Sequence, residues 1–421
     1  MSFQQGLSGL NGTAKNLDVI GNNIANASTY GAKVARAEFG DMFAAALGGG
    51  GGGTTAVGIG VRVMAVAQQF TQGNIKATDN PMDVGISGGG FFQVTDGKSP
   101  VVYTRNGQFK LDRDGYVVNN SQLRLMGYPA DASGVVQPGS SAAIRLPTGG
   151  ISPKVSSEAM IEANLDSRLA SKGSVAAPTI DFEDARTYNS ATSMTVHDEK
   201  GQQIALTYYF QKADTDVWHV FATANGVDVA GAPGAPVPLT TVTFASNGSG
   251  PVTPAAPVAI NVPATTNDVG ATTMPFAMTL DLKSVTQYGS GFGVTDMNQN
   301  GFAAGLLTSI GIEANGIVMA QYSNGKSRPA GQVELVSFRN PQGLAPIGDN
   351  AWSRTFQSGD PLGGVPGDGS LGLLQSGALE ESNIDLTGEL VNMMVAQRIY
   401  QANAQTVKTQ DQVLQTLVNL R

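Results

Sequence analysis

A short run of acidic and amide residues near position 300 has the spacing of the first half of a calcium-binding EF-hand loop. Its members are Asp296, Asn298, Asn300 and Gly301. In such a loop the twelfth residue is a glutamate that holds the ion with both carboxylate oxygens. That residue is Leu307 here, so the run does not predict a calcium site.

Histidine and cysteine offer little further chemistry. The chain has two histidines, His197 and His219, and no cysteine, and neither histidine has a second ligand at the spacing of a metal site. His219 lies in a strand-like run, which predicts a surface or half-buried side chain. The glycine-rich runs at 48–53 and 88–90 lack the Lys-Ser/Thr pair of a phosphate-binding loop. We therefore predict no catalytic, cofactor-binding or metal-binding residues, and no enzyme activity.

The composition argues against nucleic-acid and membrane binding. Only 14% of the residues are charged, against roughly 25% in ordinary soluble domains, and the net charge of −8 comes without a Lys/Arg-rich tract. No segment approaches the ~20 apolar residues of a membrane span. No basic stretch precedes an apolar run at the N-terminus. The chain is thus predicted to have neither a membrane anchor nor a classical secretion signal.

The N-terminal residues predict a helix with a narrow apolar seam. Its apolar side chains recur at spacings of three, four, three and seven, as they do between packed helices. They are Leu7, Leu10, Ala14, Leu17 and Ile24. Glycines at positions 6, 9 and 12 weaken this helix in isolation. We therefore expect the helix to need a partner and the seam to serve self-assembly.

The C-terminal residues 386–421 predict a second helix, because they contain no proline and a single glycine, Gly388. At 100° per residue, a polar stripe about 80° wide runs along it. The stripe comprises Gln397, Gln401, Gln405, Lys408, Gln412, Gln415 and Asn419. The side chains expected to pack are Val395, Ile399, Tyr400, Val407, Leu414 and Leu417. A solvated face is the simpler interpretation of the stripe, although such faces usually mix Glu with Lys and this one holds a single charge.

Between the two helices, turn signals recur every 8–12 residues, which is typical of sandwiches and barrels. We predict a mainly β fold with α-helical termini, in which paired end helices form a coiled-coil-like inner domain and each β domain is inserted in the one before. The predicted parts are a terminal helical domain (1–30 plus 386–421), a linker region (31–75 plus 370–385), a first β domain (76–150 plus 291–369) and an outer β domain (151–290).

Several segments resemble the rod and hook proteins of the bacterial flagellum. The features shared across that family are LSGLNGTAKNLDVIGNNIANASTYG at 7–31, NPMDVGISGGGFFQVTDG at 80–97, YTRNGQFKLDRDGYVVNN at 103–120, and the stretch that begins SGALEESNIDLTGELVN at 376. QYSNGKSRPAGQVELVSFRNPQGL at 321–344 and TYYFQKADTDVWHVF at 207–221 are similar to the hook proteins in particular. The resemblance covers both ends and much of the first β domain.

This resemblance implies a subunit that polymerises into a curved tube, the flexible universal joint that transmits motor torque from rod to filament. The terminal helices would surround a central export channel lined by Gln401, Gln405, Lys408, Gln412 and Gln415. The implied partners are further copies of the chain, the distal rod, hook cap and hook–filament junction proteins, and the flagellar type III export apparatus. The protein would be extracellular, exported without a cleaved signal peptide, and without cofactor, nucleic acid or membrane.

The polar run that ends the N-terminal helix is GNNIANASTYG, residues 21–31. It contains a glycosylation sequon at 26–28, but no predicted signal brings it to a glycosylating compartment. Asn and Ser side chains can instead satisfy backbone groups where a helix ends, and in a polymer they can bond a neighbouring subunit. The helix-to-linker turn is therefore assigned to Asn22, Asn23, Asn26, Ser28 and Gly31.

Two other functions stay open. The distal rod protein of the same family would build a straight, stiff tube from the same terminal motifs. A secreted β-rich adhesin or binding module would need no long terminal helices and would predict an aromatic platform. The two tryptophans, Trp218 and Trp352, lie far apart in the sequence, which disfavours the second alternative.

Overall fold

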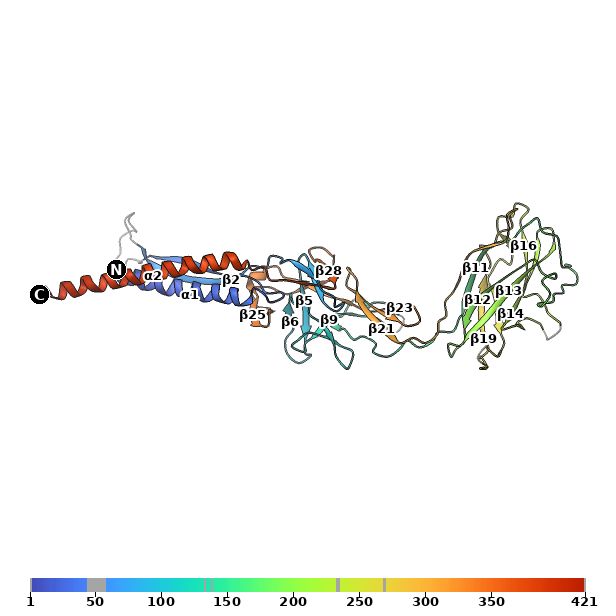
Figure 1. Cartoon of the computed structure of the whole chain (residues 1–421), viewed down its shortest axis with the longest axis horizontal. Coiled ribbons are helices and arrows are strands. Elements are labelled where there is room, and N and C mark those ends of the chain that lie inside the picture. Colours follow the sequence, from blue (N-terminus) through green and yellow to red (C-terminus); the bar gives the residue numbers. More distant parts are fainter. Residues whose placement is uncertain are drawn as a thin grey trace. The chain divides into compact units, whose positions relative to one another are not determined.

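The computed structural model describes residues 2–43, 58–131, 134–137, 139–231, 235–267 and 270–419 (Figure 1). The chain divides into two compact units. The first unit comprises 1–148, 308–321 and 327–421, and the second comprises 149–307 and 322–326. Because the first unit holds both ends and the second is inserted in it, the predicted nested, mainly β fold with helical termini is confirmed. The glycine run at 48–53 lies outside the described residues.

The ends of the chain form two helices, α1 (Ser2–Asn26) and α2 (Leu386–Asn419), which lie side by side with the hairpin of β1 (Ala35–Phe43) and β2 (Gly58–Gln68) (Figure 1). At Gly9 an added Cβ would lie 2.8 Å from Asn403 Nδ2, and at Gly6 2.9 Å from Val407 Cγ2. The glycines that weaken α1 in isolation therefore allow close approach to α2. Within the described residues, neither helix is long and apolar enough to cross a membrane.

The first unit also contains a branched sheet of short strands. Its main path runs β21-β22-β23-β9-β5-β6-β26-β25, with β7, β8, β10, β24 and β27 attached, and two small pairs, β28–β4 and β29–β3, lie apart from it. Alternate strand residues such as Phe92, Val94 and Leu125 fill one buried core. The bounds are β3 (Ile75–Ala77), β4 (Val84–Ser87), β5 (Phe91–Thr95), β6 (Val102–Thr104), β7 (Lys110–Leu111), β8 (Val117–Val118), β9 (Arg124–Pro129), β10 (Ala142–Ala143), β21 (Leu307–Ile312), β22 (Ile317–Tyr322), β23 (Ser327–Val333), β24 (Leu335–Ser337), a 3₁₀ turn (Pro341–Gly343), β25 (Ala345–Gly348), β26 (Ala351–Ser353), β27 (Leu362–Gly364), β28 (Leu373–Ser376) and β29 (Ala378–Glu380).

The second unit is a sandwich of two sheets, ordered β18-β19-β11-β20 and β12-β13-β14-β16-β17, with β15 beside β14. Side chains of both sheets share one core around the fully buried Trp218. Period-two alternation places the inward residues of each strand in that core. The bounds are β11 (Glu158–Asn164), β12 (Ser190–His197), β13 (Gln203–Asp214), β14 (Val217–Ala224), β15 (Val227–Asp228), β16 (Thr240–Phe244), β17 (Pro251–Thr253), β18 (Val258–Val262), β19 (Phe276–Asp281) and β20 (Gly293–Gln299).

The residues first considered for ligand chemistry are structural parts of this sandwich. Asp296 and Asn298 lie on strand β20 rather than in a loop. The expectation of a surface or half-buried His219 is wrong, since its side chain is only 2% exposed. Strand β14 lies between β13 and β16, and the imidazole nitrogens lie 3.0 Å from Thr241 Oγ1 and 3.3 Å from the Ser174 carbonyl. Both ring nitrogens thus have protein partners inside the fold.

Candidate assembly site at the helix–β junction

Asn23 joins three chain segments where the two helices meet the β region. Its Nδ2 donates to the Ala35 carbonyl at 2.8 Å and to Glu389 Oε2 at 3.3 Å, and its Oδ1 accepts the Ala35 N–H at 3.0 Å. The side chain is 2% exposed. One amide thus fixes the last turn of α1 against the first residue of β1 and the first turn of α2.

The other members of the helix-to-linker turn have separate positions. Asn26 donates to the Asn22 carbonyl at 2.9 Å, and Asn22 and Ser28 are exposed. Gly31 has φ +72° and donates its N–H to the Glu380 carbonyl at 2.9 Å. A Cβ there would lie 2.7 Å from the Asn106 backbone nitrogen. The structure therefore brings Asn22, Asn23 and Asn26 to one hollow, while Gly31 enters the buried network beneath it.

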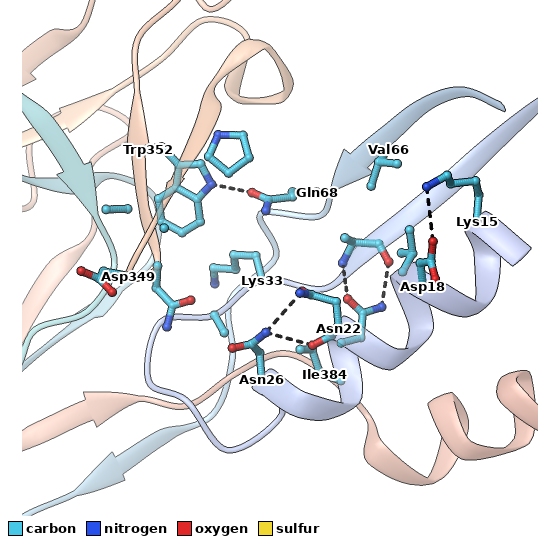
Figure 2. A pocket seen from close by; sticks show the side chains of 18 of the residues that line it. Lys15, Asp18, Asn22, Asn26, Lys33, Val66, Gln68, Asp349, Trp352 and Ile384 are labelled. Atoms are coloured by element: carbon cyan, nitrogen blue, oxygen red, sulfur yellow. Dashed lines mark hydrogen bonds and ion pairs between the residues drawn. The ribbon is translucent and has the colours of Figure 1, made fainter.

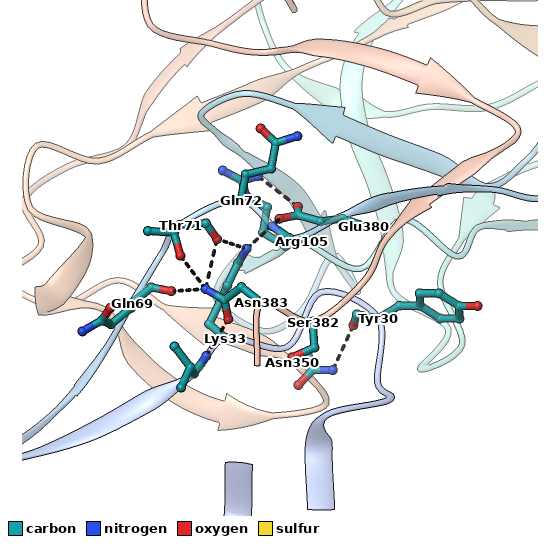
Figure 3. A network of polar contacts seen from close by, with 12 residues as sticks. Tyr30, Lys33, Gln69, Thr71, Gln72, Arg105, Asn350, Glu380, Ser382 and Asn383 are labelled. Atoms are coloured by element: carbon teal, nitrogen blue, oxygen red, sulfur yellow. Dashed lines mark hydrogen bonds and ion pairs between the residues drawn. The ribbon is translucent and has the colours of Figure 1, made fainter. Parts of the chain in front are cut away.

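Glu380 is the centre of that buried network (Figure 3). We call Glu380 and its two charged partners, Lys33 and Arg105, the junction clamp. Lys33 Nζ donates to Glu380 Oε1 at 2.6 Å, and Arg105 Nη1 donates to Oε2 at 3.0 Å. The Gly73 N–H donates to Oε1 at 2.9 Å. The three charged side chains are between 0% and 4% exposed. The clamp thus ties both linkers to the β region from inside.

The charges of the junction clamp do not balance, because two cations share one carboxylate. Burial lowers the pKa of Lys33 below its ordinary value, and the attraction of Glu380 opposes this. Lys33 Nζ also donates to the Thr71 carbonyl at 2.7 Å, and the Arg105 guanidinium lies 5.3 Å from the centre of the Phe91 ring. The carbonyl and the aromatic face give the excess positive charge additional partners.

Asn383 extends the same network toward α2. Its Nδ2 donates to the Gln69 carbonyl at 2.9 Å and to Thr71 Oγ1 at 2.7 Å, and its Oδ1 accepts the Val34 N–H at 2.8 Å (Figure 3). These partners belong to the two irregular segments that follow α1 and β2. The linkers are therefore cross-bonded to one another before α2 begins.

An aromatic cluster anchors the end of β2 beside the junction clamp. Trp352 Nε1 donates to Gln68 Oε1 at 2.5 Å, and the Trp352 ring lies edge-on to Phe70 and Phe91 at centroid distances of 5.3 and 5.7 Å. Trp352 is only 2% exposed. Edge-to-face packing of this kind adds to the area that the rings bury. The hairpin base is thus fixed to strands β5 and β26.

The expected packing residues of α2 are largely exposed in the single chain. Val395 and Ile399 are each 49% exposed, Leu414 is 53% and Tyr400 is 42%. Val407 is half-buried against α1, and the side chain of Leu417 lies outside the described residues. Gln401, Gln405, Lys408, Gln412 and Gln415 are all exposed. Among the described residues, the apolar set is thus only partly covered apart from Val407, and in the polar set Gln415 Nε2 donates to Asp411 Oδ2 at 2.9 Å.

The expected seam of α1 is only partly covered. Leu7 is 46% exposed. The side chains of Leu10, Ala14, Leu17 and Ile24 are half-buried. The fully covered side chains of α1 include Ile20, which lines a hollow of about 370 Å³ together with Val395 and Ile399 of α2. The contact between α1 and α2 thus leaves a hollow lined by apolar side chains and by polar ones such as Asn16, Glu389 and Asn392.

The junction clamp was not found by reasoning from the sequence. Lys33 and Glu380 stand 347 positions apart, and each looks like an ordinary surface charge in its local context. The signal available was the nested organisation, which brings the two linkers together. Even with that, the pattern does not distinguish Glu380 from the adjacent Glu381, which is 40% exposed and pairs with Lys76.

Four family models match separate parts of the chain, and all four describe one class of protein, the rod and hook proteins of the flagellum. Residues 3–33 match the family described as Flagella basal body rod protein, and 375–420 match Flagellar basal body rod FlgEFG protein C-terminal. Residues 85–163 match Flagellar hook protein FlgE/F/G D1 domain, and 164–302 match Flagellar basal body protein FlaE D2 domain.

Comparison with individual relatives identifies which member of this class the chain resembles. The chain is 42% identical over 429 residues to Flagellar hook protein FlgE of Salmonella typhimurium, with all of both chains covered. It is 31% identical over 456 residues to Flagellar hook protein FlgE of Borreliella burgdorferi, covering all of this chain and 99% of the other. The chain therefore belongs to the flagellar hook protein family, and the hook prediction is confirmed.

A solved structure agrees at the level of the fold. The crystal structure of Helicobacter pylori flagellar hook protein FlgE2 superposes with a TM-score of 0.51 at 14% identity, covering 74% of this chain and all of the other. The hook proteins are structural, and nothing in the described part of this chain points to catalysis.

Proposed function

We propose that this chain is the structural subunit of a flagellar hook, which self-assembles into a curved tube and transmits torque from rod to filament as a flexible universal joint. The full-length identity of 42% to a named hook protein carries this proposal. It supports the hook over the distal rod protein, which shares the terminal motifs. A secreted adhesin has no support from the relatives.

The terminal helices are proposed as the inner scaffold of the tube. Apolar side chains exposed on a helix mark an interaction surface when they are contiguous. On α2 they include Val395, Ile399 and Leu414, each about half exposed. Together with the seam of α1, at Leu7, Leu10, Ala14, Leu17 and Ile24, these residues would be buried by neighbouring copies.

The glutamine stripe of α2 is proposed to line a central export channel. Gln401, Gln405, Gln412 and Gln415 are exposed, and the residues of α2 that face α1 are others, among them Asn403 and Val407. Amide groups form hydrogen bonds without strong charge, so an unfolded chain that slides past meets few adhesive contacts. A tube reconstruction in which these glutamines pack against α1 would refute this role.

The outer parts are proposed to supply the bending. The expected outer β domain at 151–290 would slide on weak polar contacts, while the inner helices at 1–30 and 386–421 hold the tube. Proposed partners are the distal rod, hook cap and hook–filament junction proteins. Export would proceed through the flagellar type III apparatus without a cleaved signal peptide, to an extracellular hook.

Electron microscopy of the purified full chain beside a truncated chain lacking 1–30 and 386–421 tests the proposal. We expect curved tubes from the full chain and none from the truncated one. Straight tubes would select the distal rod protein. Tubes from the truncated chain would refute the role of the helices, and a full chain that stays monomeric with and without hook cap protein would contradict the proposal itself.

A further inference from the structure

Phe356 lies on the surface of the first unit. Its side chain is 102% exposed, so it touches almost nothing in its own chain. Single exposed apolar residues are common on proteins and need no function. The turn that carries Phe356, however, is fixed by several hydrogen bonds and an ion pair.

This turn spans 354–360. Ser358 is fully buried, its Oγ donates to the Thr355 carbonyl at 2.9 Å, and Thr355 Oγ1 donates to the Gly343 carbonyl at 2.5 Å. Asn340 Nδ2 donates to the Gln357 carbonyl at 3.1 Å. Arg354 and Asp360 form an ion pair across its ends. A phenyl ring on a backbone fixed in this way loses little conformational entropy when it is buried by a partner.

The first unit also has a hollow of about 560 Å³, between α1, β2 and the tip of the β25–β26 hairpin (Figure 2). Its apolar walls include Val19, Val63, Val66 and Ile384. Lys15 and Asp18, an exposed ion pair at 3.3 Å, line it from α1. Amide side chains of Asn22, Asn23 and Asn26 and the carboxylate of Asp349 line it as well. The hollow thus has an apolar part beside the exposed pair of Lys15 and Asp18.

Phe356 and this hollow lie at opposite ends of one hairpin. The turn at Asp349 and Asn350 lines the hollow. Phe356 follows the other end, where Ser353 pairs with Ala345. Since the Phe356 side chain packs against almost nothing in the described part of its own chain, a site that buries it must belong to another copy or another protein.

We propose that Phe356 of one copy inserts into the hollow of the next copy, with Arg354 facing Asp18 and Asp360 facing Lys15. The two ion pairs are complementary, since each offers one charge of either sign beside an apolar feature. A contact between two different surfaces of the same chain repeats head to tail, and it generates a helical polymer when the rotation between copies does not close into a ring. The inference rests on the proposed function, because it requires that the chain polymerises.

Thiol cross-linking tests this contact directly, because the chain contains no cysteine. In a full-length Phe356→Cys/Val66→Cys variant assembled into tubes, a short bismaleimide should join one copy to the next. We expect a ladder of dimers, trimers and larger species on denaturing gels. Phe356→Cys/Val135→Cys is the matched control, since Val135 is 59% exposed and lies away from the hollow. It should give no ladder.

Tubes of the Phe356→Cys/Val66→Cys variant that yield only monomers would overturn the inference and leave the proposed function intact. If wild-type chain forms no tubes either, the proposed function fails first. If wild type forms tubes and the double-cysteine variant does not, the critical concentration for tube growth of Phe356→Ala tests the contact instead. Losing the burial of one phenylalanine should raise the critical concentration for tube growth about tenfold or more, whereas Val135→Ala should match wild type. Equal critical concentrations for the two alanine variants would overturn the inference.

Discussion

Soluble proteins usually bury apolar side chains and expose charged ones, and two regions of this chain depart from that rule in opposite ways: the junction clamp and the exposed apolar face of α2. In the clamp, Lys33, Arg105 and Glu380 are charged and buried. On α2, Val395 and Ile399 are apolar and about half exposed. The clamp has its partners within one chain, whereas the described residues cover the apolar side chains of α2 only in part. The single chain therefore completes the base of its terminal region and leaves the helices to be completed by assembly.

This difference separates two kinds of residue in a polymer subunit. Residues at the clamp should control the stability of the isolated chain, because their interactions are already made. Residues on the exposed face of α2 should control polymerisation and leave that stability unchanged. Each substitution below tests one side of this comparison, and unfolding in urea can be followed by Trp352 fluorescence in a Trp218→Phe background.

The largest effect is expected for Glu380→Gln. The change leaves two buried cations without a carboxylate, and removal of one partner from a buried ion pair costs about 3–5 kcal/mol. Glu381→Gln is the control, since its pair with Lys76 is partly exposed and long at 3.6 Å, and should change the unfolding free energy by less than about 1 kcal/mol. Equal effects of the two substitutions on the unfolding free energy would show that the clamp does not stabilise the isolated chain more than a surface ion pair does.

The second largest loss of unfolding free energy is expected for Gly31→Ala. At φ +72°, the new Cβ would lie 2.7 Å from the Asn106 backbone nitrogen, which cannot move away as a side chain would. Strain of this kind should lower the unfolding free energy by roughly 2–3 kcal/mol. Gly21→Ala, in α1 with nothing within 4 Å of the added Cβ, should stabilise the chain by up to about 1 kcal/mol. The changes in unfolding free energy should therefore have opposite signs, a loss for the glycine in the turn and a gain for the glycine in the helix.

Asn23→Ala should cost about 1–2 kcal/mol, because it removes the partners of the Ala35 N–H and carbonyl in a buried setting. The exposed neighbour Asn22 serves as control, and Asn22→Ala should stay within about 0.5 kcal/mol. Thermal unfolding of both variants provides the measurement. A larger loss for Asn22 would show that the turn acts through its exposed side chains.

The smallest effect on the isolated chain is expected for Ile399→Ser. The side chain is 49% exposed, so the unfolding free energy should change by less than about 0.5 kcal/mol. The critical concentration for tube growth should nevertheless rise several-fold, because the exposed half of the side chain would be buried by a neighbouring copy. Gln401→Ser on the same helix should leave it unchanged. A destabilised monomer with normal tube growth would reverse the assignment of the α2 face.

The sequence allowed the helices, the mainly β middle and the family to be predicted, because these depend on local patterns. Absence of proline and regular apolar spacing indicated both helices. The way in which the helices meet was harder to predict. Gly6 and Gly9 give close contact with α2, while Leu7 of the expected seam is 46% exposed. Periodicity identifies an apolar face, but a single chain cannot indicate whether its own helix or a neighbour covers that face.

Long-range polar contacts escaped prediction for a different reason. Asn23 was singled out with its neighbours for its ability to bond near a helix end, and the structure gives it partners on two other elements, β1 and α2. Nothing local separates it from the exposed Asn22. The buried His219 was missed because its partners, Thr241 and Ser174, come from segments distant in sequence. Burial of a polar side chain depends on the completed fold.

The sequence separation within the junction clamp has a consequence for the order of folding. Lys33 and Glu380 close a loop of 347 positions, and contacts of such high contact order form late and slowly. Nearly all of the second unit lies in the continuous stretch 149–307, so its core can form while the ends of the chain are still apart. We therefore expect the clamp to form after the core of the second unit, so that a copy whose ends have not yet met would lack a rigid base from which to join a growing polymer.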